Sequence, residues 1–219
     1  MEMTQAQLAA MIDHTFLKAA GEADAVDRLC AEAREWKFAC AMVNPCEVAH
    51  ARRLLEGSGV PVGTVIDFPL GQGSLTATLM AAAAAVQEGA HDLDFVLNVR
   101  KLKYGDAASL QNDLNTLAHF CHAEKRVSKL ILECCYLTDD EKVKACRLAQ
   151  RAGFDFVKTS TGFAAGGATV EDVRLMRKAV GRKMGVKAAG GIRDRATALA
   201  MVAAGATRIG ASAGKSLLA

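Results

Sequence analysis

The chain has 219 residues, of which 51% are hydrophobic and 5% aromatic, and its formal net charge is +3. A chain of this length can bury about 70% of the surface that its unfolded form exposes, so we expect one sizeable core and a single domain over residues 1–219. The small net charge argues against nucleic acid or an anionic membrane as partners. It remains compatible with a local pocket for an anionic metabolite.

The start of the chain lacks the cationic segment and the apolar run of a secretory signal, and no stretch approaches about 18 uninterrupted apolar residues. The seven cysteines are odd in number and contain no C-x-x-C pair. This argues against a disulfide framework and a zinc knuckle and favours reduced thiols. We therefore expect a cytoplasmic protein.

Short apolar or β-branched runs alternate with longer helical patterns along the chain. The predicted strands are 12–15, 39–44, 62–67, 93–98, 129–133, 154–160, 185–188 and 208–211. Helical patterns lie near 22–36, 46–56, 74–88, 106–124, 139–152, 169–180 and 194–204. Several helices are expected to begin at an N-cap, as at Ser74, Thr138 and Thr169. Many are expected to end at a left-handed glycine, as at Gly57, Gly89, Gly153, Gly181 and Gly205.

Eight strands with helices between them predict an α/β fold of the (β/α)₈ type, a TIM barrel. A doubly wound sheet is the alternative. It would need fewer strands and a phosphate-binding loop after the first one, and neither G-x-G-x-x-G nor G-x-x-x-x-G-K-[ST] occurs in the chain. In a barrel of this type the reactive residues lie at the C-terminal ends of the strands.

Two lysines at predicted strand ends, Lys158 and Lys187, carry most of the functional information. Both could simply extend their charged heads into water from a buried stem. However, each is followed by small residues and glycine, which suit a strand end that opens into a ligand-binding loop. Two such cations close together disfavour each other's protonation, and a neutral lysine can attack a carbonyl to form a Schiff base. This chemistry indicates a class I aldolase.

Two aspartates on other predicted strands, Asp94 and Asp13, could supply carboxylates to the same opening. A buried carboxylate paired with an ammonium can hold and pass a proton, which an enamine mechanism requires at several steps. A purely structural salt bridge is the alternative for both residues.

Two glycine-rich segments follow the lysines, at 190–193 and 210–214. Barrel enzymes often bind phosphate with backbone N–H groups of these last two loops, and Arg193 and Ser212 add side-chain donors. Glycines can also mark only tight turns. A third loop, 162–168, could form a mobile cover near the substrate.

His119 and His122 have a spacing that could hold a metal, but they end the fourth predicted helix, away from the catalytic mouth, so we expect no metal site.

Segments spread over nearly the whole chain carry a family resemblance. They include Asp13-His14-Thr15-Phe16-Leu17-Lys18, Val43-Asn44-Pro45, Asp67-Phe68-Pro69-Leu70-Gly71, Leu93-Asp94-Phe95-Val96-Leu97-Asn98, Lys158-Thr159-Ser160-Thr161-Gly162-Phe163, Gly185-Val186-Lys187 through Arg193, and Arg208-Ile209-Gly210. On these motifs the chain resembles deoxyribose-phosphate aldolases of the short bacterial and archaeal type. The family fold is a TIM barrel, which agrees with the strand count.

The resemblance implies reversible cleavage of 2-deoxy-D-ribose 5-phosphate to D-glyceraldehyde 3-phosphate and acetaldehyde. Lys158 matches the Schiff-base lysine, and Lys187 the second lysine that lowers its pKa and shares in proton transfer. Asp94 matches the acidic partner, and Asp13 a further acid at the rim of the network. The positions expected around the substrate and its phosphate are Thr15, Lys18, Thr161, Gly162, Gly190, Gly191, Arg193, Gly210 and Ser212. No cofactor or metal is implied, the partners are a phosphorylated sugar and acetaldehyde, and a homodimer or homotetramer is compatible with the family.

Four positions depart from the family pattern: Asp67, Ala189, His91-Asp92 and Ala213. None removes a reacting group, although Ala213 should weaken phosphate binding by one side-chain hydrogen bond, on the order of 1 kcal/mol.

Two other functions remain open. One is a different lysine-dependent barrel aldolase or a transaldolase, and the other is a catalytically silent barrel that binds a phosphorylated metabolite. Retention of Lys158, Lys187 and Asp94 together argues against the silent protein.

Overall fold

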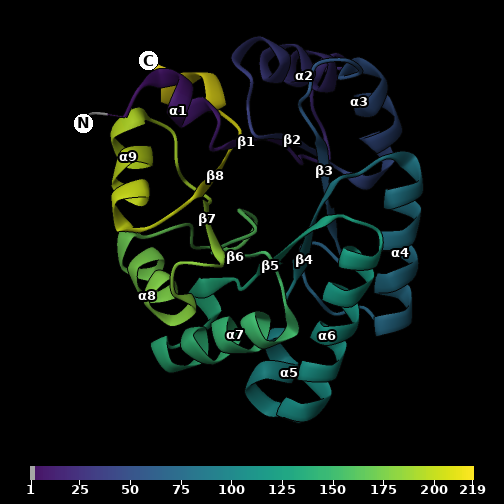
Figure 1. The fold of residues 1–219 in the computed structure, drawn as a ribbon, viewed down its shortest axis with the longest axis vertical. Coiled ribbons are helices and arrows are strands. Elements are labelled where there is room, and N and C mark those ends of the chain that lie inside the picture. Colours follow the sequence, from purple (N-terminus) through teal and green to yellow (C-terminus); the bar gives the residue numbers. More distant parts are fainter. Residues whose placement is uncertain (1–2) are drawn as a thin grey trace.

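A computed structural model describes residues 3–219 and contains a closed barrel of parallel strands, which confirms the predicted fold (Figure 1). The strands are β1 (Ile12–Phe16), β2 (Cys40–Val43), β3 (Val62–Ile66), β4 (Asp92–Val96), β5 (Val127–Ile131), β6 (Phe156–Lys158), β7 (Gly185–Ala189) and β8 (Arg208–Ala211). Each strand pairs with the next in the sequence, and β8 closes on β1.

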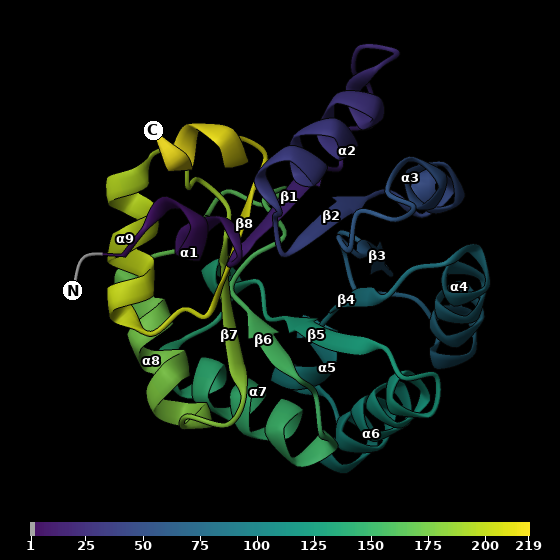
Figure 2. The same ribbon diagram turned by 45° about the horizontal axis from the view of Figure 1, so that its top comes forward.

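Helices form a ring outside the strands, as the tilted view shows most plainly (Figure 2). They are α1 (Gln5–Ala9), α2 (Ala25–Trp36), α3 (Val48–Leu54), α4 (Leu75–Glu88), α5 (Val99–Tyr104), α6 (Ala107–Ala123), α7 (Asp139–Ala152), α8 (Val170–Val180) and α9 (Arg195–Ala204), with the short 3₁₀ turns η1 (Pro45–Glu47), η2 (Cys134–Tyr136) and η3 (Gly214–Leu218). The predicted N-caps Ser74, Thr138 and Thr169 each accept a hydrogen bond from a backbone N–H in the first turn. The predicted caps Gly89, Gly153 and Gly205 are left-handed. Two others are wrong: α3 ends at Leu55, before Gly57, and Gly181 caps α8 with a ψ of −156°, outside the left-handed helical region.

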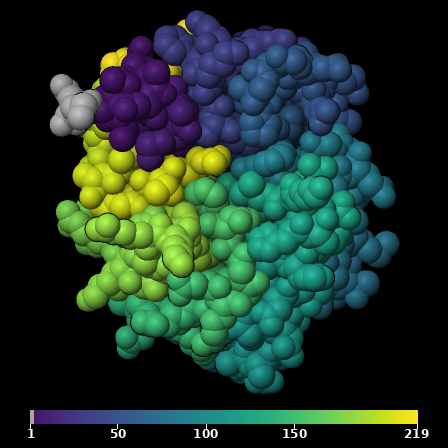
Figure 3. Space-filling model, in the orientation of Figure 1, coloured from purple at the N-terminus to yellow at the C-terminus, as the bar shows by residue number. Residues whose placement is uncertain are grey.

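Two helices were absent from the prediction because they are too short to show a helical period. The five-residue α1 is held by a capping box between Thr4 and Gln7, and it contacts η3, so that the purple N-terminal and yellow C-terminal segments lie against each other (Figure 3). The six-residue α5 follows its N-cap Asn98, a residue that the sequence pattern places in the fourth strand. The Asn98 side chain accepts a hydrogen bond from Lys101 N at 2.8 Å and so ends the strand.

Apolar side chains fill the layer between the strands and the helices, whereas the inside of the barrel holds charged side chains beside a small second apolar cluster of Leu17, Cys40, Met42 and Val65. In β4, for example, Leu93 and Phe95 belong to the outer apolar cluster. Asp92, Asp94 and Val96 alternate with them and therefore face the barrel interior. Among residues 3–219, no helix is long and apolar enough to cross a membrane.

Candidate active site

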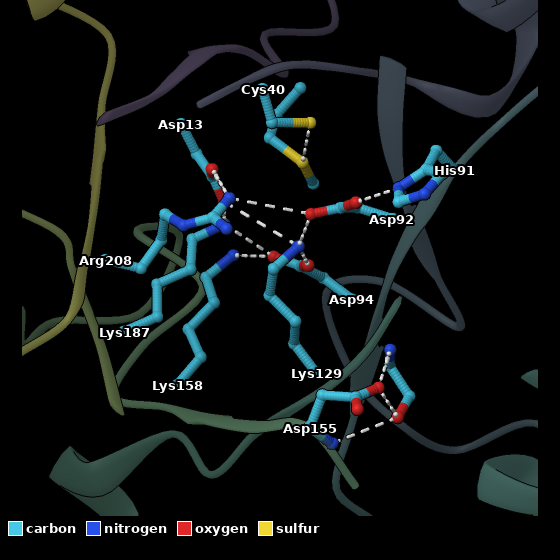
Figure 4. Close-up of polar contacts among 12 residues, drawn as sticks. Asp13, Cys40, His91, Asp92, Asp94, Lys129, Asp155, Lys158, Lys187 and Arg208 are labelled. Atoms are coloured by element: carbon cyan, nitrogen blue, oxygen red, sulfur yellow. Dashed lines mark hydrogen bonds and ion pairs between the residues drawn. The ribbon is translucent and has the colours of Figure 1, made fainter. Parts of the chain in front are cut away.

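A cluster of charged side chains lies inside the barrel (Figure 4). It contains Asp13 from β1, Asp92 and Asp94 from β4, Lys129 from β5, Lys158 from β6, Lys187 from β7 and Arg208 from β8. All except Arg208 are buried, and the Arg208 side chain is 18% exposed. Parallel register brings these residues together, because Asp94 pairs with Lys129 and Lys158 pairs with Lys187 on adjacent strands.

Asp94 is the centre of the cluster. Its Oδ2 accepts hydrogen bonds from Lys158 Nζ at 2.9 Å and from Lys187 Nζ at 2.8 Å, and its Oδ1 accepts one from Lys129 Nζ at 2.9 Å. Burial alone would raise the pKa of Asp94, but the surrounding ammonium groups outweigh burial and hold this pKa well below its usual value. Asp94 is therefore a carboxylate that links the three lysines.

Asp13 is completely buried and joins the network through Lys187 and Arg208. Its Oδ1 accepts a hydrogen bond from Arg208 at 2.6 Å, and its Oδ2 lies 2.5 Å from Lys187 Nζ. Burial opposes ionisation of Asp13, but the positive charges of Lys187, Lys129 and Arg208 outweigh burial and lower its pKa.

Lys187 differs from the prediction. It lies in the middle of β7, not at the strand end, and is held between two aspartates.

Sequence reasoning missed Lys129, Asp92 and Arg208 as members of the cluster. Lys129 Nζ donates to Asp92 Oδ2 at 2.6 Å and to Asp94 Oδ1 at 2.9 Å while being fully buried. Its signal was available, because Lys129 is a single lysine in an apolar strand, the same feature that identified Lys158. His91, at the entrance to β4, lies 2.7 Å from Asp92 through Nδ1 and extends this end of the cluster toward the surface.

The charges of the cluster do not balance when every group is ionised, since three lysines and one arginine face three aspartates. The pKa of Lys158 is lowered to about 8, because burial and the charges of Lys187 and Lys129 together outweigh the opposing effect of Asp94. For Lys129, in contrast, Asp92, Asp94 and Asp13 outweigh burial and raise its pKa well above its usual value. Deprotonation of Lys158 near neutral pH therefore removes the surplus positive charge of the cluster.

A cavity of about 420 Å³ opens above Lys158 at the C-terminal ends of the strands. All nine positions expected to surround the substrate line this cavity: Thr15, Lys18, Thr161, Gly162, Gly190, Gly191, Arg193, Gly210 and Ser212. Lys18 and Arg193 are exposed and place two positive charges at its edge. Asp13, Asp94 and Lys187 lie beneath the cavity rather than in its lining.

Gly210 has little room for a side chain. A Cβ at this position would lie 2.9 Å from Ala189 Cβ and 3.1 Å from Lys187 Cε, so the absence of a side chain keeps Lys187 in place. Gly190 and Gly191 both adopt positive φ, which favours glycine in the turn after β7.

The loop 162–168 extends beside the cavity. Its base is fixed to the turn after β7, because Ala168 N donates to Gly190 O at 3.0 Å. Phe163, the second residue of the loop, is 54% exposed and packs edge-on against Phe68 at a ring separation of 5.1 Å. The mobility that we expect of this loop stays a prediction.

One group of side chains in the described residues has donor atoms close enough for a metal, namely Asp13, Cys40 and Asp92, within 4.8 Å of one another. Both carboxylates already pair with lysine or arginine. Burial raises the pKa of the Cys40 thiol well above its usual value, which disfavours the thiolate that a metal requires. The donor set therefore does not fit a metal ion.

Comparisons with known proteins agree over almost the entire chain. Residues 7–218 match the DeoC/LacD family aldolase model. A deoxyribose-phosphate aldolase of Bacteroides thetaiotaomicron is 52% identical over 208 residues, which cover 95% of this chain and 87% of that protein. One from Streptococcus pneumoniae is 53% identical over 207 residues, covering 94% of this chain and 93% of its own length.

Solved structures show the same fold. The tetrameric deoxyribose phosphate aldolase of Aeropyrum pernix superposes with a TM-score of 0.92 and is 32% identical. The match covers 98% of this chain and 91% of the Aeropyrum pernix chain. A Coccidioides immitis protein superposes with a TM-score of 0.93 and is 39% identical. The match covers 100% of this chain and 86% of the Coccidioides immitis chain. With a buried lysine cluster beneath a cavity in a (β/α)₈ barrel, and with these relatives, the chain belongs to the DeoC/LacD aldolase family, whose members are lyases.

Proposed function

We propose that the protein reversibly cleaves 2-deoxy-D-ribose 5-phosphate to D-glyceraldehyde 3-phosphate and acetaldehyde through a Schiff base on Lys158. The supporting observation is that, within residues 3–219, Lys158 is the one lysine of the buried cluster that lines the cavity. Its lowered pKa leaves a sizeable neutral fraction at physiological pH. The close relatives that bear the name deoxyribose-phosphate aldolase support the same substrate.

The reaction begins when neutral Lys158 Nζ attacks the aldehyde carbon of the open-chain sugar. Loss of water gives an iminium ion, which draws electrons from the bond between C2 and C3 as that bond breaks. The C3 hydroxyl loses its proton and becomes the aldehyde of glyceraldehyde 3-phosphate, and the remaining two carbons stay on Lys158 as an enamine. Protonation of the enamine carbon and hydrolysis then release acetaldehyde and restore the lysine.

Proton exchange at Lys158 Nζ is assigned to Asp94 and Lys187. Both nitrogens contact the same Asp94 oxygen, at 2.9 and 2.8 Å, so a proton can pass between them without large movement. Asp13 acts indirectly, since it holds Lys187 against this oxygen from the other side. These roles make Lys158 the nucleophile and Lys187 with Asp94 the proton-handling pair.

The substrate phosphate is assigned to the opposite wall of the cavity, formed by the turns after β7 and β8. Gly190, Gly191 and Gly210 allow close approach of the backbone, and Arg193 and Ser212 add donors. Binding energy from this remote group can position the reacting carbons, so unphosphorylated 2-deoxyribose should lose turnover as well as affinity.

One assay tests the proposal: 2-deoxyribose 5-phosphate with coupled detection of glyceraldehyde 3-phosphate. We expect turnover without added nicotinamide, flavin, pyridoxal or metal, because the iminium ion is the electron sink. Borohydride with acetaldehyde should attach carbon to Lys158 and to nothing in Lys158→Ala. An adduct mapped to Lys187 would reverse the assignment, and activity lost in a chelator and restored by zinc would indicate a metal-dependent aldolase.

A different lysine-dependent aldolase of the same fold remains the second candidate, because donor specificity depends on pocket shape. Adduct formation at Lys158 without cleavage of 2-deoxyribose 5-phosphate would favour it. A dimer or tetramer also stays a prediction, supported by the tetramer of the Aeropyrum pernix relative and testable by light scattering.

A further inference from the structure

His14 is a buried titratable side chain to which the proposed function gives no role. Its neighbours on β1 face the inside of the barrel, because Asp13 joins the charged cluster and Thr15 lines the cavity. Side chains alternate along a strand, so His14 points outward into the layer between the strands and the helices. It is only 3% exposed there, and a buried imidazole is costly without polar partners.

The His14 ring has contacts with α2, with Phe38 and with η3. Its Nε2 lies 2.8 Å from Glu32 Oε2 on α2, and this nitrogen donates because the carboxylate oxygen accepts. The ring packs against the Phe38 ring at a centroid distance of 5.0 Å. Its Nδ1 faces Gly214, where a Cβ would lie only 2.7 Å from this nitrogen. Glu32 therefore fixes the orientation of the ring, and the ring lies directly against the backbone of Gly214.

Gly214 is the first residue of η3 and ends the turn that follows β8. The turn starts at Ala211, which is the register partner of His14 on the neighbouring strand. Ser212 and Ala213 lie between these two points, and Ser212 lines the cavity on the wall assigned to the substrate phosphate. Strand pairing thus fixes the start of the turn, and the His14 ring limits where its end can lie. Binding groups must be held to within about 0.5 Å of their productive positions, so the end of this turn matters for the phosphate.

We propose that His14 is a positioning residue for the substrate phosphate and that, held by Glu32, its ring sets the position of the turn 211–214. Among residues 3–219, His14 does not line the cavity, so it acts through the turn and not on the substrate itself. A displaced turn should weaken recognition of the phosphate and leave the reactivity of Lys158 toward a small aldehyde unchanged. The inference rests on the proposed phosphate site after β8.

Substitutions on both sides of the contact test this role. Gly214→Ala places a Cβ against His14 Nδ1, so the turn must move, while the φ of Gly214 is not positive and alanine adds no backbone strain. His14→Ala leaves the turn without its support. Loss of one hydrogen bond to the phosphate corresponds to about fivefold in affinity, so kcat/KM for 2-deoxyribose 5-phosphate should fall by about fivefold in each single variant. In the double variant the alanine methyl group occupies space that the ring has left, so kcat/KM should return toward the wild-type value.

Two readouts without a phosphate separate positioning from general damage to the fold. Borohydride trapping with acetaldehyde and kcat/KM for unphosphorylated 2-deoxyribose should keep their wild-type values in all three variants. His50→Gln is the matched control and should change none of these values. His50 also pairs with a carboxylate of α2, Asp27, at 2.6 Å, but it lies on α3 and is 40% exposed.

A wild-type kcat/KM for 2-deoxyribose 5-phosphate in Gly214→Ala would overturn the proposal. So would a loss of equal size for the phosphorylated and the unphosphorylated sugar, or losses in the single variants that multiply in the double variant. Two results in the wild type would instead refute the proposed function. These are failure of acetaldehyde to label Lys158, and equal kcat/KM for 2-deoxyribose and its 5-phosphate, which would remove the phosphate site itself.

Discussion

Replacement of Lys187 by leucine should raise the pH at which Lys158 becomes reactive. Lys158 Nζ and Lys187 Nζ contact the same Asp94 oxygen at 2.9 and 2.8 Å, so the two nitrogens are less than about 6 Å apart. At an effective dielectric constant of about 20, their repulsion is about 3 kcal/mol, which corresponds to about 2 pKa units. Leucine removes this repulsion and leaves Asp94 attracting the Lys158 ammonium, which acts in the same direction.

The expected loss of trapping follows from the neutral fraction of Lys158. With the pKa at about 8, roughly a quarter of the lysine is neutral at pH 7.5. A rise of about 2 units reduces that fraction to about 0.3%, a loss of about 80-fold. Since a neutral amine is the reactive form, Lys187→Leu should regain trapping above pH 10, whereas the wild type should reach its plateau near pH 9.

The measurement is the initial rate of borohydride trapping with acetaldehyde across pH 6.5–11, with the adduct mapped to Lys158. Lys103→Leu is the matched control, because Lys103 is also partly buried and paired with a carboxylate, Glu141, at 2.6 Å, but lies outside the barrel interior. A midpoint near pH 8 in Lys187→Leu, with trapping at pH 7.5 close to the wild-type rate, would refute the electrostatic reasoning.

Three further substitutions probe the cluster and the cavity. Asp94→Asn should lower the free energy of unfolding by about 3–5 kcal/mol at pH 7, because it leaves three buried ammonium groups without their common carboxylate. The difference in unfolding free energy from the wild type should become smaller below about pH 4, where the carboxylate of the unfolded wild type is protonated. Denaturant titrations at both pH values check this. Lys129→Met should destabilise by a similar amount, since it leaves Asp92 and Asp94 without their shared cation, and a stability within 1 kcal/mol of the wild type would contradict the buried pairing. Gly210→Ala should displace Lys187 and lower kcat in the coupled assay by at least tenfold, with circular dichroism reporting whether the barrel persists.

The barrel was predictable because it depends on a pattern that local sequence carries. Each strand is a short apolar run, and glycine or an N-cap residue marks where many helices end or begin, as Gly153 and Thr138 do around α7. The helices α1 and α5 were not predictable in this way, because five or six residues give too little periodicity. Their formation depends on tertiary contacts and on single caps such as Asn98.

The cluster was less predictable, because barrel closure determines which charged residues meet. Lys129 is 35 residues from Asp94 in sequence, and Lys187 is 93 residues from it, yet both contact its carboxylate. The sequence marked each lysine as unusual but did not reveal whether it would line the cavity or lie beneath it. The two lysines are register partners, but Lys158 is the last residue of β6, whereas Lys187 is followed by two more residues of β7.

Unequal pairing of the lysines supports the proposal that Lys158 is the nucleophile. Lys129 pairs with three aspartates and Lys187 with two, and neither lysine lines the cavity. Lys158 contacts Asp94 alone and shares that carboxylate with the other two ammonium groups. It therefore receives the least compensation for burial, so it can lose its proton at the lowest cost. The lysine with the fewest ionic partners is thus also the one beside the cavity, where a free amine can reach a carbonyl carbon.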